Sequence, residues 1–136
     1  MLRITLIRHA KSSWNDAGLS DFERPLNGRG QRDAPVMAER LRALKRAPDR
    51  LISSPALRAI STARIFAKEF GIKAQDIELR PRIYDASLAT LIEVLRQISP
   101  DVRHALLFGH NPGFSELAQW LATCPFQEMP TCAIAD

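Results

Sequence analysis

The chain has few of the residues that would mark it as secreted, zinc-stabilised or membrane-bound. Its 136 residues include two cysteines, Cys124 and Cys132, and a single pair at that spacing matches no zinc motif. We expect free thiols, because a disulfide is unusual in a reducing compartment. No apolar run approaches the ~18 residues of a membrane span. The amino-terminal run is short and broken by Arg3, unlike a signal peptide. These absences predict a cytoplasmic protein without a membrane partner.

Aromatic residues and acidic clusters are also scarce. Aromatic residues make up 7% of the chain and form no stacking series, and the arginines are dispersed, which argues against a nucleic-acid partner. Since no acidic cluster is present to hold magnesium, we expect neither a metal nor another cofactor. The chain does have a net charge of +4, carried mostly by arginine. The planar fork of arginine matches the geometry of phosphate, so these residues predict a phosphate-bearing partner.

The order of apolar runs and helix signals predicts an α/β fold, with a single domain over residues 1–136. Strands are expected at residues 2–8, 49–53, 77–79 and 104–109. Helices are expected after Asn27, after Ser54-Pro55, after Ser87 and over 113–122, ending near Arg46, Gly71, Pro100 and residue 122. This alternation predicts a three-layer α/β/α fold, a mostly parallel Rossmann-like sheet with helices on both faces. Residues 131–135 look like a final strand that is very short or truncated.

Two of the predicted strands deliver a histidine to their carboxyl ends. Strand 2–8 ends at Arg8 and is followed by His9, while strand 104–109 is followed by His110. Ligands bind at the carboxyl ends of strands in open α/β sheets, so we expect these side chains to meet. Arg58 lies near the amino end of the helix that follows strand 49–53, where the helix dipole favours an anion.

These residues suit metal-free phosphoryl transfer, which needs cationic donors around phosphorus and one nucleophile in line with the leaving group. We expect neutral His9 to attack and form a phosphohistidine, with its other ring nitrogen donating to a backbone carbonyl. Arg8 and Arg58 are expected to hold the phosphoryl oxygens and to lower the pKa of His9. His110 is expected to donate a hydrogen bond, more usefully when protonated. Each residue alone has a structural interpretation; their convergence favours a site.

The general acid is the part of the predicted site with the most alternatives. An alkyl ester needs its leaving oxygen protonated, and Asp85 is the candidate carboxylate, although a helix-flanking role explains it equally well. Asp21 and Glu23 are alternatives. A phosphoramidate such as phosphohistidine needs less help from an acid. Further candidate donors to the phosphoryl group are two polar loop residues, Ser12 and Asn15, although such residues more often stabilise loops.

Four segments, in chain order, resemble motifs of the histidine phosphatase (phosphoglycerate-mutase-like) superfamily. The first is similar to its Arg-His-Gly motif, with alanine in the place of glycine: Arg8-His9-Ala10-Lys11-Ser12-Ser13-Trp14-Asn15. The others are Arg24-Pro25-Leu26-Asn27-Gly28-Arg29-Gly30, Ser53-Ser54-Pro55-Ala56-Leu57-Arg58-Ala59 and Gly109-His110-Asn111-Pro112-Gly113. The last has the form seen in small SixA-type phosphohistidine phosphatases.

The resemblance spans nearly the whole chain and implies a Rossmann-like phosphatase that needs no metal. It implies His9 as the phosphorylated residue, with Arg8, Arg58 and His110 completing the phosphate pocket. SixA-type members imply a phosphohistidine-containing signalling or phosphotransfer protein as substrate. The inserted cap segments of sugar-phosphate mutases are missing, which favours an open site. A small-molecule phosphomonoesterase and a phosphate-binding module without turnover are the alternatives.

Overall fold

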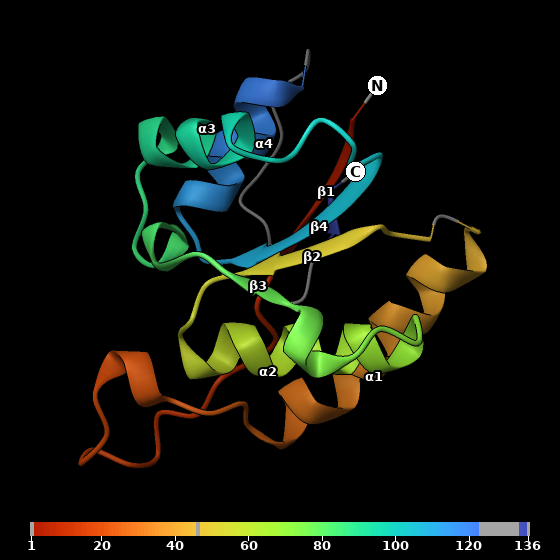
Figure 1. Cartoon of the computed structure of the whole chain (residues 1–136). Coiled ribbons are helices and arrows are strands. Elements are labelled where there is room, and N and C mark those ends of the chain that lie inside the picture. Colours follow the sequence, from red (N-terminus) through yellow and green to blue (C-terminus); the bar gives the residue numbers. More distant parts are fainter. Residues whose placement is uncertain (1, 46, 123–133, 136) are drawn as a thin grey trace.

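A computed structural model of the chain describes residues 2–45, 47–122 and 134–135. Five strands form one sheet in the order β3-β2-β4-β1-β5 (Figure 1). The mutually parallel strands are β1 (Arg3–Arg8), β2 (Arg50–Ser53), β3 (Glu78–Leu79) and β4 (His104–Gly109). β5 (Ile134–Ala135) pairs antiparallel with β1. The mostly parallel sheet predicted from the sequence is confirmed, and β5 lies within the segment that looked like a final strand.

Helices cover both faces of this sheet (Figure 1). α1 (Gly28–Ala43) and α2 (Leu57–Glu69) lie on one face, and α3 (Leu88–Arg96) and α4 (Gly113–Leu121) lie on the other. Each face has its own hydrophobic cluster, because alternate side chains of β4 point to opposite faces: Leu106 and Phe108 join the first cluster, and Leu107 joins the second. All six residues of β4 are buried, as expected for a central parallel strand. The three-layer α/β/α prediction is confirmed.

Two of the predicted helix caps are present as expected. The Asn27 side chain accepts a hydrogen bond from the Gly30 amide at the start of α1, and Ser87 accepts one from the Thr90 amide at the start of α3. The predicted end of the second helix also holds, because Gly71 follows α2 with a φ of 69°, which favours glycine.

Other predicted helix boundaries were wrong. α2 begins at Leu57 rather than after Ser54, because the Ser54 hydroxyl accepts from the Ala56 amide in a turn that precedes the helix. α1 ends at Ala43 instead of near Arg46, since Lys45 takes a φ of 56° that a helix cannot continue. α3 ends at Arg96, before Pro100 is reached.

Two glycines allow helices to begin in close contact with the loops after β1 and before α3. A Cβ at Gly30 would lie 2.2 Å from the Lys11 carbonyl oxygen, so α1 begins directly against the segment that follows β1. A Cβ at Gly113 would lie 2.6 Å from the Ala86 carbonyl oxygen, so α4 begins against the segment that precedes α3. Only glycine permits both approaches.

The predictions for the two cysteines and for the domain boundaries are not tested by the described residues. Cys124 and Cys132, expected to be free thiols, lie outside the described ranges. Within those ranges, no helix is long and apolar enough to cross a membrane. The assignment of residues 1–136 to one domain stays a prediction.

Candidate active site

The carboxyl ends of β1 and β4 place two histidines side by side. Arg8 of β1 is paired in register with Gly109 of β4, so His9 and His110 both follow at this edge of the sheet. Their ring centroids lie 5.3 Å apart, and both residues are more than nine-tenths buried, with exposures of 6% and 8%. The structure therefore brings together the two histidines that the sequence places at strand ends, with Arg8 at the end of β1.

His9 is held as a neutral imidazole whose Nε2 carries the lone pair. Its Nδ1 donates to the Ala10 carbonyl oxygen at 2.8 Å, while its Nε2 accepts from Arg58 Nε at 3.4 Å. Burial is the largest cause that lowers the pKa of His9, to about 4; the bond to Ala10 opposes this, and the charges of Arg58 and Arg8 add to it. The sequence predicted the direction from charge alone, whereas burial contributes more.

His110 is also neutral in the phosphate-free chain. Its Nε2 is hydrogen-bonded to Ser54 Oγ at 2.7 Å, and its buried Nδ1 has no hydrogen-bond partner among the described residues. Burial, followed by the charges of His9 and Arg58, lowers the pKa of His110 to about 3. The protonated form that the sequence favoured for this residue is therefore disfavoured before an anion binds.

Arg58 connects α2 to the segment that carries His9. Because α2 begins at Leu57, Arg58 lies in its first turn, buried beside the histidines. The Thr62 hydroxyl donates to the Arg58 carbonyl oxygen and accepts from the Ala10 amide, at 2.8 and 3.0 Å. This arrangement holds the Arg58 guanidinium against His9 and directs the amino end of the helix toward any bound anion.

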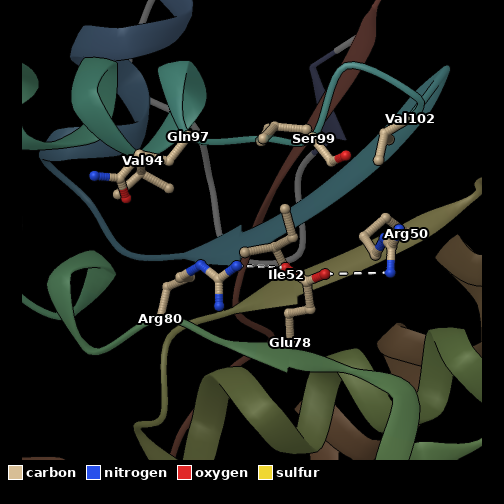
Figure 2. A pocket seen from close by; sticks show the side chains of 9 residues that line it. Arg50, Ile52, Glu78, Arg80, Val94, Gln97, Ser99 and Val102 are labelled. Carbon is tan, nitrogen blue, oxygen red and sulfur yellow. Dashed lines mark hydrogen bonds and ion pairs between the residues drawn. The ribbon is translucent and has the colours of Figure 1, made fainter.

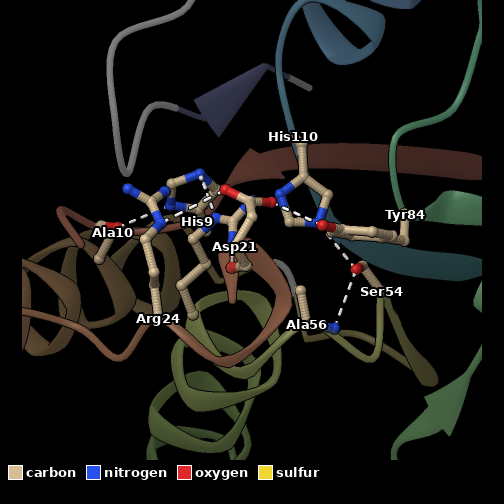
Figure 3. Close-up of polar contacts among 9 residues, drawn as sticks. His9, Ala10, Asp21, Arg24, Ser54, Ala56, Tyr84 and His110 are labelled. Atoms are coloured by element: carbon tan, nitrogen blue, oxygen red, sulfur yellow. Dashed lines mark hydrogen bonds and ion pairs between the residues drawn. The ribbon is translucent and has the colours of Figure 1, made fainter. Parts of the chain in front are cut away.

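Asp21, one of the alternative acids, supplies the carboxylate of this cluster (Figure 3). Its Oδ2 accepts from Arg58 Nη2 at 3.0 Å and from the Tyr84 hydroxyl at 2.6 Å, and its Oδ1 lies 3.4 Å from Arg24 Nε. The hydrogen bond from Tyr84 and then that from Arg58 lower the pKa of Asp21, although partial desolvation opposes them. Asp21 is therefore ionised at neutral pH.

The other sequence candidates lie outside this network of polar contacts. Asp85 is exposed and has a φ of 51°, and no polar contact among the described residues joins it to either histidine. The same holds for Glu23 and Asn15, which are exposed. Ser12 is buried and pairs through its backbone with Leu26, which closes the loop between them.

Two cluster residues, Arg24 and Tyr84, were given no role from the sequence. The Tyr84 ring packs edge-on against the His110 ring at 5.5 Å, and its hydroxyl donates to Asp21. Arg24 is buried against Trp14, with its guanidinium carbon 3.4 Å from the Trp14 ring centroid. Their neighbours held the signal: Tyr84 precedes Asp85, and Arg24 begins the second family-like segment.

A second pair of arginines, away from the histidines, is already matched by a carboxylate. Arg50 and Arg80 line a pocket between the sheet edge and α3 (Figure 2), and Glu78 lies between them. Arg50 Nη1 lies 3.3 Å from Glu78 Oε1, and Arg80 Nη2 lies 2.7 Å from Glu78 Oε2.

The histidine cluster differs from that pocket because three arginines, rather than two, gather near one carboxylate and because it also holds two buried histidines. Arg24 and Arg58 pair with the Asp21 carboxylate, and the charges of Arg58, Arg8 and Arg24 all act on the neutral His9 ring, an arrangement suited to an anionic electrophile. Within the described residues, no group of three or more histidine, cysteine, aspartate or glutamate side chains gathers in a way that could hold a metal ion.

Comparison with known proteins gives concordant matches. The family model described as the histidine phosphatase superfamily (branch 1) matches residues 4–105. An uncharacterized chloroplastic protein of Arabidopsis thaliana is 31% identical over 141 residues, covering 98% of this chain, and this chain spans 64% of its length. An uncharacterized protein of Mycobacterium tuberculosis is 38% identical over 117 residues, covering 86% of this chain and 70% of that protein.

Among solved structures, the chain is similar to SixA from Agrobacterium tumefaciens, described as a candidate phosphohistidine phosphatase. The TM-score is 0.87 with 27% sequence identity, and the match covers 98% of this chain and 89% of that one.

Proposed function

The chain belongs to the histidine phosphatase superfamily (branch 1), and from this premise we propose that it is a metal-independent phosphatase that works through a phosphohistidine on His9. We propose further that its substrate is the phosphohistidine of a signalling or phosphotransfer protein. The observation that carries the proposal is the state of His9: Nδ1 donates to a carbonyl oxygen, so Nε2 carries the lone pair that attacks once Arg58 turns its donor to the phosphoryl group.

In the first step, His9 Nε2 forms a bond to phosphorus while the bond from phosphorus to the substrate nitrogen breaks. The substrate imidazole leaves with that electron pair as a neutral ring, because its other nitrogen has taken up a proton from solvent. Arg58, which donates to His9 Nε2 in the free chain, turns its donors to the phosphoryl oxygens together with Arg8. His110 donates from one ring nitrogen once the bound anion offsets the burial that keeps it neutral.

In the second step, a water molecule attacks phosphorus and the bond to His9 Nε2 breaks. The nitrogen recovers its lone pair, and the products are inorganic phosphate and the regenerated enzyme. The net reaction consumes one water molecule and leaves the substrate histidine unmodified.

The state of Asp21 favours a phosphoramidate over an alkyl ester. An alkoxide leaving group needs a proton from a carboxylic acid, whereas Asp21 is ionised and bonded to Arg58 and Tyr84. An imidazole leaving group is far less basic than an alkoxide, so a site without a committed acid suffices. The likeness to SixA supports the same substrate class. A cytoplasmic location and the absence of nucleic-acid and membrane partners stay predictions from the sequence.

The test is turnover, without added metal, of a phosphohistidine-bearing protein domain and of a panel of small phosphomonoesters. Wild type and His9→Ala are assayed in parallel, and phosphoenzyme is trapped by acid-free quenching and detected by mass. We expect cleavage of the phosphohistidine alone, with phosphate on His9 and no turnover by His9→Ala.

Faster turnover of small esters would contradict the protein substrate and favour a phosphomonoesterase. Asp21→Asn and Asp85→Asn would then show which carboxylate protonates the leaving oxygen. Wild type that is as inert as His9→Ala on every substrate would leave only a phosphate-binding module.

A further inference from the structure

Arg24 is a buried cation whose donors are largely unused. Its side chain is 9% exposed, yet Nε and Nη1 are both buried without a hydrogen-bond partner among the described residues. Buried polar groups are nearly always hydrogen-bonded, and a buried charge without partners is unfavourable, so this side chain requires an explanation.

The contacts that Arg24 does make hold it in place without satisfying it. The Trp14 ring covers one face of the guanidinium at 3.4 Å, and this ring is itself 75% exposed. Asp21 Oδ1 is 3.4 Å from Nε, but Oδ2 of the same carboxylate is already committed to Arg58 and Tyr84. Arg24 is thus positioned by stacking and by one long ion pair.

The location of Arg24 is beside the nucleophile. Figure 3 shows its side chain next to His9, on the same side of the Asp21 carboxylate. The two side chains also interact electrostatically, since the charge of Arg24 adds to the burial that lowers the pKa of His9. Desolvation, followed by the charge of Arg58, lowers the pKa of Arg24. Like charges gathered around a single carboxylate attract a dianion.

We propose that Arg24 is a third guanidinium of the phosphoryl-binding site, whose Nη1 and Nε donate to a non-bridging oxygen when the substrate binds. The long contact with Asp21 is replaced by charge-assisted hydrogen bonds to the anion. Trp14 fixes the position of the Arg24 guanidinium by stacking on it. This inference rests on the proposed function insofar as the bound group is a phosphoryl group.

A purely structural arginine in this protein has a different environment. Arg80 donates to Glu78 at 2.7 Å in the pocket of Figure 2, and Arg42 donates to Glu69 at 3.1 Å. Both side chains are at least partly in water, where a remaining donor is solvated. Among the described residues, Arg24 has no ion pair shorter than the 3.4 Å contact with Asp21, and its Nε and Nη1 are buried from solvent.

The experiment compares Arg24→Met, Arg24→Lys and a matched control, Arg29→Met, in the full chain. Arg29 is in the same segment, but its side chain is 69% exposed and pairs only with Asp33. Thermal unfolding with and without inorganic phosphate gives both the intrinsic stability and the phosphate affinity. Competitive inhibition by phosphate of the phosphohistidine assay gives the affinity independently.

We expect Arg24→Met to fold with a Tm, without phosphate, equal to or above that of wild type, because an unsatisfied buried charge is removed. Its phosphate affinity should fall about 10- to 100-fold, as for the loss of a hydrogen bond between charged groups. KM should rise with a smaller change in kcat. Arg24→Lys should recover part of the affinity, because it keeps the charge without the planar fork. Arg29→Met should behave as wild type.

The inference is overturned on its own if wild type binds phosphate and turns over substrate while Arg24→Met has the same affinity. A variant that fails to fold, or whose Tm without phosphate drops while its phosphate affinity is kept, also overturns it in favour of a structural role. Wild type that shows neither phosphate binding nor phosphoenzyme would overturn the proposed function as well, so the two failures are distinguishable.

Discussion

The two ends of the β1–β4 strand pair carry the same residue types in opposite states. At the amino end, Arg3 pairs in register with His104, whose Nδ1 faces the Ala47 carbonyl oxygen at 3.3 Å and whose Nε2 meets Thr5 Oγ1 at 2.8 Å. At the carboxyl end, the buried Nδ1 of His110 has no hydrogen-bond partner in the part of the chain that the structure describes. A satisfied histidine stabilises the fold, whereas an unsatisfied one beside excess positive charge indicates a ligand that is still to come.

The amino end has a second sign of structural use. The Asp49 carboxylate accepts from the amides of Arg103 and His104, at 2.6 and 2.9 Å, and these backbone bonds lower its pKa. Because the Asp49 carboxylate is already hydrogen-bonded to two backbone amides, its role is structural. Asp21, at the other end, instead pairs with the side chains of Arg58 and Arg24, whose donors can turn to a bound phosphoryl group.

The largest expected effect comes from a substitution at the carboxyl end of the strand pair. His9→Ala should lower turnover of the phosphohistidine substrate by about 10³-fold or more, because the covalent route is lost. Its free energy of unfolding near pH 7 should change little, since the lost bonds to Ala10 and Arg58 are offset by the removal of a buried polar ring. Steady-state kinetics and urea unfolding measure the two quantities. If His9→Ala lost stability but kept its kcat, His9 would have a structural role and the comparison of the two ends would be wrong.

The matching change at the amino end should have the opposite outcome. His104→Ala removes a hydrogen bond to the buried Thr5 hydroxyl and should lower the free energy of unfolding by about 1–3 kcal/mol. Turnover per folded molecule should stay within about twofold of wild type. The double variant Thr5→Val with His104→Leu, which removes both partners, should recover part of the stability. A loss of kcat in folded His104→Ala would contradict the comparison.

The pH dependence of stability sharpens the same contrast. The pKa values of His9 and His110 are lowered to about 4 and about 3, whereas histidine in an unfolded chain titrates near ~6.5. Between these values the unfolded chain binds more protons, so the free energy of unfolding rises with pH and falls as the pH is lowered from neutral toward 4. Each histidine contributes at most ~1.4 kcal/mol per pH unit.

Urea unfolding across that window tests the sign. In the double variant His9→Asn with His110→Asn, the slope between about pH 4.5 and 6.5 should be flatter than in wild type. Carboxylates that titrate at lower pH remain in both proteins, so they cancel in the comparison. An identical slope in the two proteins would refute the lowered pKa values.

The smallest expected effect concerns Tyr84. Tyr84→Phe removes the hydroxyl that donates to Asp21 at 2.6 Å but keeps the ring against His110. Because Asp21 is then held less firmly in its contact with Arg58, we expect a change of about two- to fivefold in KM, with stability within ~0.5 kcal/mol of wild type. Substrate titration measures the change. A loss of kcat as large as that in His9→Ala would place Tyr84 in the reacting geometry.

The sequence predicted the strand-end residues well, because a parallel sheet brings the carboxyl ends of its strands to one edge. His9, His110 and Arg58 follow from that rule and from the apolar runs before them. The carboxylate did not follow from it. Asp21 reaches the site through a loop that brings its carboxylate to Arg58, whereas Asp85 is exposed and takes a positive φ that periodicity does not signal.

The start of α2 was missed for a similar reason. Ser54 followed by Pro55 has the local chemistry of a helix cap, but its hydroxyl is used by His110 at 2.7 Å, a residue 56 positions away. Burial as the main cause of the lowered pKa of His9 was also invisible in the sequence, which shows nearby charges but not depth.

The loop that carries Trp14, Asp21 and Arg24 has a further consequence for how such a protein can diversify. Its two ends are joined at a narrow neck, where Ser12 pairs with Leu26 and the Ser13 amide donates to the Pro25 carbonyl oxygen at 2.9 Å. Loop-closure entropy grows only slowly with length, and a closed neck keeps a longer insertion from displacing the strand behind it. The part of the loop between Trp14 and Asp21 can therefore be lengthened or exchanged to contact other phosphorylated compounds, while Asp21, Arg24 and His9 keep their positions.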